Sequence, residues 1–266
     1  MYALVRRSSA IAAALAALIS GCGDDNHPTA PDGPSLLQIG SAADSPVEVT
    51  LYSEQSPTIG YARLTIGLRD ADTGTIIDDA QVVLTPMMHM QHDDGSTMSH
   101  SAPQEAVIAG GDSLFTTATI FIMSGMWEMN VAFETESHSG TLSLDVEVGP
   151  GSHVQAISVG DERFFVTLIE PRSPRVGPND LELCVHRRAS MMSFPAVTDL
   201  DIDMDVSMPS MNHGSSGNVA PVAAAATDGH YHGTVNFTMT GDWHVDLALG
   251  ESGEELLTTG FDMTVQ

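Results

Sequence analysis

Positive charge is scarce in this sequence. Lys and Arg together number 9 against 35 Asp and Glu, and the formal net charge at pH 7 is -26. Nucleic acid and anionic lipid surfaces would both repel such a protein, so we expect neither as a direct partner. Cations would be attracted, although solubility alone is the more common reason for acidity of this kind.

The sequence signatures of common enzyme classes are also missing. There is no Gly-x-Ser-x-Gly elbow, no His-Glu-x-x-His pair, no phosphate-cradling glycine loop and no dinucleotide fingerprint. We therefore expect a binding protein and no catalytic residues.

Long apolar runs are absent as well. The chain opens with MYALVRR, which contains two arginines, continues with a short apolar run from Ala10 to Ile19, and then reads Ser20-Gly21-Cys22. This is typical of a secretory signal and too short for a membrane span. Leu18 to Cys22 also resembles a bacterial lipobox, in which the cysteine is lipidated and becomes the first mature residue. An ordinary cleaved signal with a chance cysteine is the alternative.

Cysteine is nearly absent, since Cys184 is the only one besides Cys22. If Cys22 carries lipid, no intramolecular disulfide is possible and the fold depends on packed cores. We expect Cys184 to be a small buried apolar residue, with metal ligation as the alternative. Residues 22–46 are rich in Pro, Gly and Asp, which predicts a flexible tether after the signal peptide of residues 1–21.

The rest of the chain repeats one pattern. Val49-Thr50-Leu51 recurs as Val166-Thr167-Leu168, and residues 121–127 (FIMSGMW) recur as residues 237–243 (FTMTGDW), at nearly the same offset. Several matches at one offset indicate a duplicated unit. We predict two domains, at residues 47–148 and 164–266, joined by a linker at 149–163.

Both units read as antiparallel β-sheet. Their segments are short, alternate apolar with polar residues, and are broken by Gly, Pro and Asp, for example Tyr61 to Arg69 and Thr141 to Val148. Period-two alternation with frequent turns predicts an all-β protein with two tandem Ig-like sandwiches, and an eight-stranded barrel is the competing architecture. Trp127 and Trp243 occupy the same place in both units and are expected as core anchors.

Several motifs of the second unit resemble the YtkA-like family of extracytoplasmic Ig-fold domains. These motifs are Met208 to Gly214, Gly229 to Gly233, and Met239 to Trp243. The first unit is similar but more divergent, with Thr85 to Met88 standing where Met208 to Met211 does and Phe115 in place of Tyr231. The resemblance implies a β-sandwich in both units and, weakly, copper.

Met and His crowd the stretch from Pro86 to His100. A thioether is a soft ligand and a neutral imidazole a borderline one, so this mixture suits copper better than calcium or magnesium. We expect a flexible metal-scavenging loop. Its candidate ligands are Met88, His89, Met90, His92, Met98 and His100.

A second candidate group lies in the second unit. On a strand, His230 and His232 project to one side and Tyr231 to the other. If a loop at the same end of the sandwich carries the remaining candidates, three imidazoles and two thioethers converge on one ion. Those remaining candidates are Met208, Met211 and His213. The alternative is that the two methionines cap the core and the histidines are solvated.

Two functions follow from these observations. The favoured one is a copper-binding lipoprotein on the periplasmic face of the cell envelope, which buffers the ion or delivers it to a partner protein. The alternative is a non-catalytic Ig-like module that holds an envelope partner without metal, with its methionines as adaptable apolar contacts.

Overall fold

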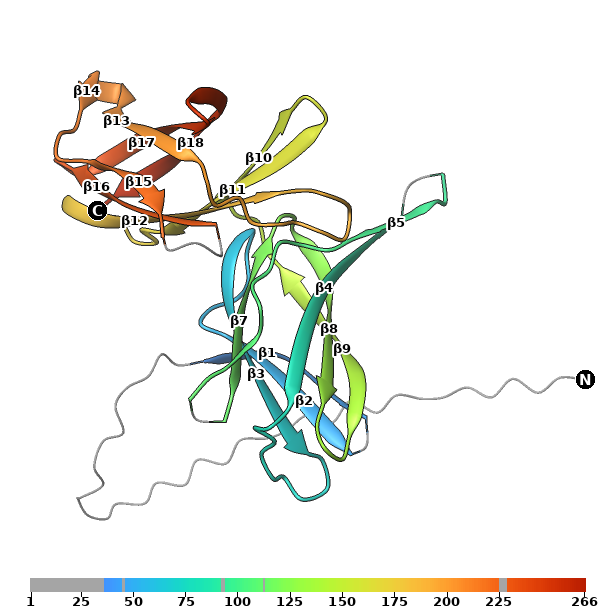
Figure 1. Ribbon diagram of the computed structural model, residues 1–266. Helices are drawn as coiled ribbons and strands as arrows, with labels where there is room; N and C mark the ends of the chain where they lie inside the picture. Colours follow the sequence, from blue (N-terminus) through green and yellow to red (C-terminus); the bar gives the residue numbers. More distant parts are fainter. Residues whose placement is uncertain (1–35, 45, 92–93, 112, 225–228) are drawn as a thin grey trace, which may run out of the picture. The chain divides into compact units, whose positions relative to one another are not determined.

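The computed structural model describes residues 36–44, 46–91, 94–111, 113–224 and 229–266. Across these ranges the regular elements are β-strands, apart from a short 3-10 turn at Pro209–Met211 (Figure 1). No helix in the described part is long and apolar enough to cross a membrane. The predicted signal peptide, the predicted lipid anchor Cys22 and the candidate ligand His92 lie outside the described residues.

The first sandwich consists of two antiparallel sheets. The first sheet has the order β1-β2-β3-β7-β6 and the second the order β5-β4-β8-β9. Their strands are β1 (Leu37–Asp44), β2 (Val47–Ser53), β3 (Gly60–Asp70), β4 (Gln81–Gln91), β5 (Thr97–His100), β6 (Ile108–Ala109), β7 (Phe115–Phe121), β8 (Gly125–Glu134) and β9 (Ser139–Val148).

The second sandwich repeats this topology. Its sheets have the orders β10-β11-β12-β16-β15 and β14-β13-β17-β18, so each strand has a counterpart in the first sandwich. The strands are β10 (Val154–Val159), β11 (Glu162–Glu170), β12 (Gly177–Arg187), β13 (Asp201–Met208), β14 (His213–Gly214), β15 (Val219–Ala223), β16 (His230–Phe237), β17 (Gly241–Glu251) and β18 (Glu254–Val265). The predicted all-β fold with two tandem sandwiches is confirmed.

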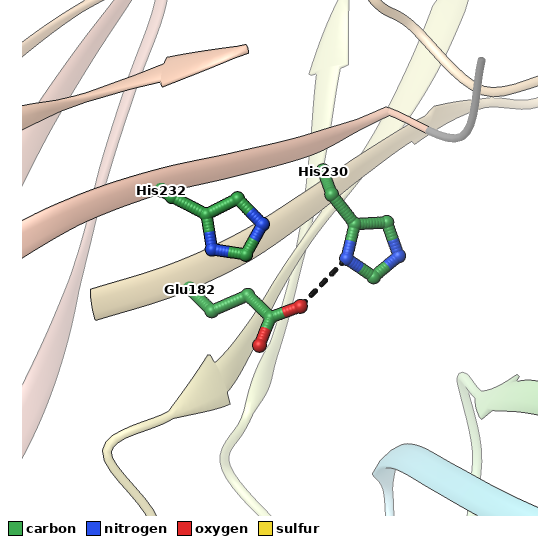
Figure 2. A group of neighbouring side chains, drawn as sticks. All are labelled: Glu182, His230 and His232. Carbon is green, nitrogen blue, oxygen red and sulfur yellow. Dashed lines mark hydrogen bonds and ion pairs between the residues drawn. The ribbon is translucent and has the colours of Figure 1, made fainter. Parts of the chain in front are cut away.

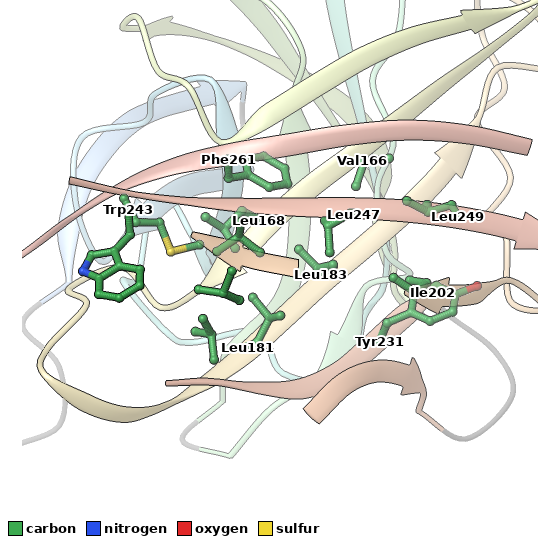
Figure 3. Packing of buried hydrophobic residues seen from close by; sticks show 14 of the residues in the cluster. Val166, Leu168, Leu181, Leu183, Ile202, Tyr231, Trp243, Leu247, Leu249 and Phe261 are labelled. Atoms are coloured by element: carbon green, nitrogen blue, oxygen red, sulfur yellow. The ribbon is translucent and has the colours of Figure 1, made fainter. Parts of the chain in front are cut away.

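Each core is formed by the inward residues of alternating strands. In β17 the side chains of Trp243, Leu247 and Leu249 all point into the second core, because residues two apart on a strand share a face (Figure 3). Trp127 fills the same position in the first core and is fully buried. Burial of a large apolar side chain contributes roughly 1.5 to 3 kcal/mol, so each of these positions stabilises its sandwich by about that amount.

Two strands lie where the sequence predicted irregular chain. β1 occupies the end of the predicted tether and pairs with β2, and β10 occupies the predicted linker and pairs with β11. The tether and linker predictions were wrong for these residues. Both are outer strands of their sheets, none of their residues is fully buried, and they lack the apolar pattern of a central strand. The boundaries of the two domains stay predictions.

The methionine-rich stretch is also more ordered than expected. β4 continues through Pro86 to Gln91 and pairs with β5, so that Met88 lies opposite His100 and Met90 opposite Met98. The predicted flexible loop is therefore a β-hairpin. Pro86 and the Asp-Gly pair are residue types common in loops, whereas here Pro86 is buried within a strand.

Contacts join Ser35–Gln266 into one compact unit. Part of this contact is apolar: Ile120 of β7 packs with Ile169 and Cys184 of the second sandwich. Cys184 is completely buried, which confirms the expectation that it is a small buried residue. Residues of the two sandwiches therefore pack together at this point in a small apolar cluster separate from the two cores.

Candidate metal centre

The pairing of β12 with β16 brings two histidines and a carboxylate together. Glu182 lies directly opposite His232 in the antiparallel register. His230 comes two residues earlier on β16, so it projects from the same face as His232 (Figure 2). Tyr231 projects from the opposite face into the core, where it is fully buried. The predicted orientation of these three residues is confirmed.

The three side chains are close enough to share an ion. One donor atom each from Glu182, His230 and His232 can be chosen so that all lie within 4.8 Å of one another. Nδ1 of His230 is 2.8 Å from Oε1 of Glu182. The two imidazole rings are nearly parallel, with their centroids 6.4 Å apart.

Residues of the first sandwich cover the far side of His230. Nε2 of His230 is 2.9 Å from Oε1 of Glu105. The Tyr61 hydroxyl donates a hydrogen bond of 2.5 Å to the same oxygen, and its ring contacts the imidazole edge-on. This cover explains why His230 is buried although it lies on the outer face of its sheet, while His232 is exposed.

The ionisation of the surrounding groups follows from this network. Burial raises the pKa of Glu105, but the hydrogen bonds from His230 and Tyr61 together with the positive charge of His230 outweigh it, and the pKa lies below its usual value. The hydrogen bond with His230 lowers the pKa of Glu182 against the opposing effect of burial. Burial, reinforced by the hydrogen bond to Glu105, raises the pKa of Tyr61 strongly. Both carboxylates are therefore anionic at neutral pH, which favours a bound cation.

The donor set is two imidazole nitrogens and a carboxylate oxygen. Imidazole and carboxylate suit borderline divalent ions such as Zn²⁺ and Cu²⁺, with metal–nitrogen distances near 2.1 Å, so tetrahedral donors lie roughly 3.4 Å apart. A small movement of exposed His232 would reach that spacing. No sulfur donor belongs to this group, so it does not have the character expected for Cu⁺.

The other candidate ligands of the second unit lie elsewhere. Met208 is 2% exposed and belongs to the core, whereas Met211 is 62% exposed. The His213 ring lies 5.9 Å from that of Trp243, and its Nε2 is 3.1 Å from Oγ1 of Thr238. Thr238 follows the end of β16, eight residues beyond His230, or about 26 Å along an extended strand. The expected convergence of Met208, Met211 and His213 with His230 and His232 was wrong.

The register also corrects the alignment of the two units. Met88 pairs with His100 as Met208 pairs with His213. The His100 ring lies 5.4 Å from that of Trp127, as His213 lies beside Trp243. Met88 is therefore the counterpart of Met208, and not of Met211 as the sequence comparison suggested. Like Met208, Met88 is a core residue.

The remaining candidates of the first unit separate into two groups. His89 is exposed and points outward, with Nδ1 2.8 Å from Oγ of Ser99 and Nε2 3.8 Å from a carboxylate oxygen of Glu128. Met90, Met98 and His100 instead line one pocket. The structure thus brings three of the predicted residues together at one pocket, which Met88 and His89 do not line.

Sequence reasoning missed Glu182 and Glu105. A signal for Glu182 existed, because it alternates with the apolar residues Leu181 and Leu183 and must project outward from its strand. What the sequence could not provide was the register that sets it opposite His232. Glu105 comes from an irregular segment of the other sandwich, and no local pattern indicates its position.

Residues 159–248 match the YtkA-like family. The match lies within the second sandwich, and it confirms the resemblance seen there in the sequence. The second sandwich is accordingly a YtkA-like domain, and the first has the same strand order. No curated protein matches the chain.

Solved structures with similar folds share little sequence with this chain. Domains 5–6 of the S-layer protein SbsC are 13% identical, cover 88% of this chain and 98% of that chain, and give a TM-score of 0.32. A conserved domain protein from Bacillus anthracis is 10% identical over 87% of this chain and 92% of that chain, with a TM-score of 0.34. The Yersinia pseudotuberculosis adhesin InvE is 15% identical over 79% of this chain and 56% of that chain, with a TM-score of 0.26. Likenesses at this level carry no functional inference.

Proposed function

We propose that this protein binds a borderline divalent metal ion, with Cu²⁺ favoured, through Glu182, His230 and His232. One observation carries the proposal: these three residues form a cluster with donor atoms within 4.8 Å of one another. At a site of nitrogen and oxygen donors the first-row divalent ions bind in an order that reaches its maximum at Cu²⁺, which favours copper over zinc.

Glu105 supports this assignment from outside the donor set. If Nδ1 of His230 binds the ion in place of its contact with Glu182, its Nε2–H donates to Glu105 at 2.9 Å. Histidine ligands in metal sites commonly donate their second N–H to a carboxylate, which fixes the ring orientation and increases the basicity of the coordinating nitrogen. The hydrogen bond from Tyr61 holds Glu105 in place.

The site belongs to an extracytoplasmic protein in our proposal. The lipobox-like sequence ending at Cys22 supports attachment to the cell envelope through lipid, and the YtkA-like match supports a location outside the cytoplasm. Because His232 is exposed, a bound ion remains accessible to another protein. We propose that the ion is buffered there or passed to a partner protein of the envelope.

One observation favours a second function. Both nitrogens of His230 already have carboxylate partners, Glu182 and Glu105, without an ion. A protonated imidazole between two carboxylates is a satisfied arrangement that ties β16 to the first sandwich. In that case the protein is an Ig-like structural or interaction module at the envelope.

Metal titration of the mature chain separates these functions. We expect Cu²⁺ to bind in competition with a chelator of known affinity, and His232→Ala and Glu182→Gln each to weaken binding at least about tenfold, as loss of groups around a metal typically does. His89→Ala is the matched control, since His89 is also an exposed histidine but lies outside the cluster. Equal affinity in all four proteins would contradict the metal site and leave the structural function.

A further inference from the structure

A second group of metal-type donors lines a pocket that shares no residue with the His/Glu cluster. The pocket has a volume of about 300 Å³. Met90 and Met98 face each other across the β4–β5 hairpin, and Met123 follows β7. The donor-bearing residues in its lining are Met90, Met98, His100, Met123 and Met191. Thioethers thus reach this pocket from three separate segments of the chain.

The hydrogen bonding of His100 fixes which ring nitrogen carries the proton. Nδ1 of His100 lies 2.8 Å from the backbone oxygen of Ser101. A carbonyl oxygen accepts but cannot donate, so Nδ1 must carry the hydrogen. In the neutral ring Nε2 then holds the lone pair and is the nitrogen able to coordinate a metal.

Nε2 of His100 has no hydrogen-bond partner among the described residues, and His100 is 3% exposed. Leaving a buried acceptor unsatisfied costs about 1 to 3 kcal/mol, so such an atom calls for an explanation. Donation of Nδ1–H to a backbone carbonyl with Nε2 directed to a metal is a common arrangement of histidine ligands. A bound soft ion would satisfy this nitrogen.

The same backbone segment positions Met191. The Ser101 N–H donates a hydrogen bond of 2.8 Å to the backbone oxygen of Met191. Ser101 therefore connects to His100 through its oxygen and to Met191 through its nitrogen. This holds the backbone of Met191 beside the segment that carries His100, and both residues line the pocket.

The charge around the pocket favours a monovalent ion. Arg163 and Arg188 also line it, and Arg163 donates a hydrogen bond of 3.0 Å to Ser158. Their repulsion of a cation grows in proportion to its charge, so it opposes Cu²⁺ or Zn²⁺ twice as strongly as Cu⁺. Thioether and neutral imidazole donors are likewise the soft, uncharged ligands that select Cu⁺.

The second sandwich supplies an internal comparison. Its counterpart of His100 is His213, and Met211 precedes His213 by two residues as Met98 precedes His100. Met211 is 62% exposed, and Nε2 of His213 already contacts Thr238. The equivalent end of the second sandwich therefore has similar residue types, but its methionine is exposed and Nε2 of its histidine has a hydrogen-bonding neighbour.

We propose that this pocket is a Cu⁺ site, in which Nε2 of His100 and the thioethers of Met98 and Met191 coordinate the ion, with Met90 and Met123 at its border. The site is independent of the His/Glu cluster proposed above for a divalent ion. Met123 is 39% exposed and leaves the pocket open to an ion from solvent.

The test is a Cu⁺ titration of the mature chain under reducing, anaerobic conditions against a chromogenic Cu⁺ chelator. The double variant Met98→Leu/Met191→Leu removes both sulfurs and approximately preserves side-chain volume, so it keeps the packing. We expect it to weaken Cu⁺ binding at least about tenfold, as loss of metal-site groups does. Met211→Leu is the matched control, because it removes a sulfur at the equivalent exposed position, and we expect unchanged affinity.

Nuclear magnetic resonance gives a second readout that does not depend on affinity. Ag⁺, a redox-inert analogue of Cu⁺, should shift the Nε2 resonance of His100 and the methyl signals of Met98 and Met191, while those of His213 and Met211 stay in place. Wild-type affinity in the double variant, or shifts confined to His213 and Met211, would overturn the proposal. His232→Ala separates the two sites: it should leave Cu⁺ binding intact even where it abolishes Cu²⁺ binding.

Discussion

Nε2 of His230 lies 2.9 Å from Oε1 of Glu105, although the two residues are 125 positions apart in the sequence. The contact joins a strand of the second sandwich to an irregular segment of the first. A histidine that would otherwise be solvated on a sheet surface is thereby held in a single orientation. The geometry of the His/Glu cluster consequently depends on a residue outside the YtkA-like match.

Glu105→Gln tests that dependence. Glutamine keeps the size of the side chain but removes its negative charge, so the imidazole loses its carboxylate partner. We expect Cu²⁺ affinity to fall by about 10- to 100-fold, the range typical of residues that orient metal ligands, with little change in the folded structure. Calorimetric titration measures this, and Glu136→Gln at an exposed position serves as the control. Unchanged affinity would mean that Glu105 does not position His230.

Trp243→Ala should unfold or strongly destabilise the second sandwich. The side chain is 1% exposed, and its Nε1–H donates to the backbone oxygen of Met239 at 3.0 Å. Truncation of a buried aromatic residue costs roughly 3 to 5 kcal/mol. Denaturant unfolding followed by circular dichroism measures the loss, and exposed Met211→Ala should change little. A variant with full stability would refute the role of Trp243 as a core anchor.

Tyr231→Phe should lower the free energy of unfolding measurably, but by less than Trp243→Ala does. The Tyr231 hydroxyl donates to the backbone oxygen of Val197 at 2.9 Å and accepts from the N–H of Leu200 at 3.1 Å. Loss of the hydroxyl leaves buried backbone groups without a partner, at a cost of about 1 to 3 kcal/mol. The same unfolding experiment applies, with partly exposed Tyr52→Phe as the control. Equal stability of Tyr231→Phe and Tyr52→Phe would show that the two hydrogen bonds of the Tyr231 hydroxyl make no net contribution to the free energy of unfolding.

The pairing of His244 with Asp262 predicts a pH dependence. Nδ1 of His244 is 2.6 Å from Asp262, and this hydrogen bond raises the pKa of His244 above 6.5 against the effect of partial burial, with help from Asp246. Because the folded pKa exceeds the unfolded one, the stabilisation is fully present below about pH 6.5 and is lost as pH rises through the folded pKa.

We therefore expect an NMR titration to give His244 a pKa above its usual value, and Asp262→Asn to bring that pKa down. Asp203→Asn, at an exposed position of another strand, should leave it in place. A pKa for His244 that is the same with and without Asp262 would contradict the predicted pairing effect.

The duplicated fold could be predicted because its signals are periodic and repeated. Trp127 and Trp243 mark the same core position, and the outward pair His230 and His232 followed from strand alternation alone. The partners of those histidines could not be predicted in this way. Glu182 depends on the register between two strands, and Glu105 depends on how one sandwich contacts the other.

The candidate metal ligands show the same limit. Composition placed Met90, Met98 and His100 among the candidates of one stretch, and the structure shows that these three line one pocket. It also proposed Met88 and Met208, whose thioethers belong to cores. Methionine suits both a soft ion and an apolar interior, and the sequence alone does not distinguish the two uses where burial depends on tertiary contacts.

The lining of the Met/His pocket by both sandwiches has a thermodynamic corollary. Met98 and His100 belong to one sandwich and Met191 to the other, joined by the Ser101–Met191 hydrogen bond. An ion that binds residues of both sandwiches strengthens the association of the sandwiches. Because linkage is reciprocal, that association strengthens ion binding by the same factor. Ion binding would then restrict the motion of the two sandwiches relative to each other, and a force that separates the sandwiches would release the ion.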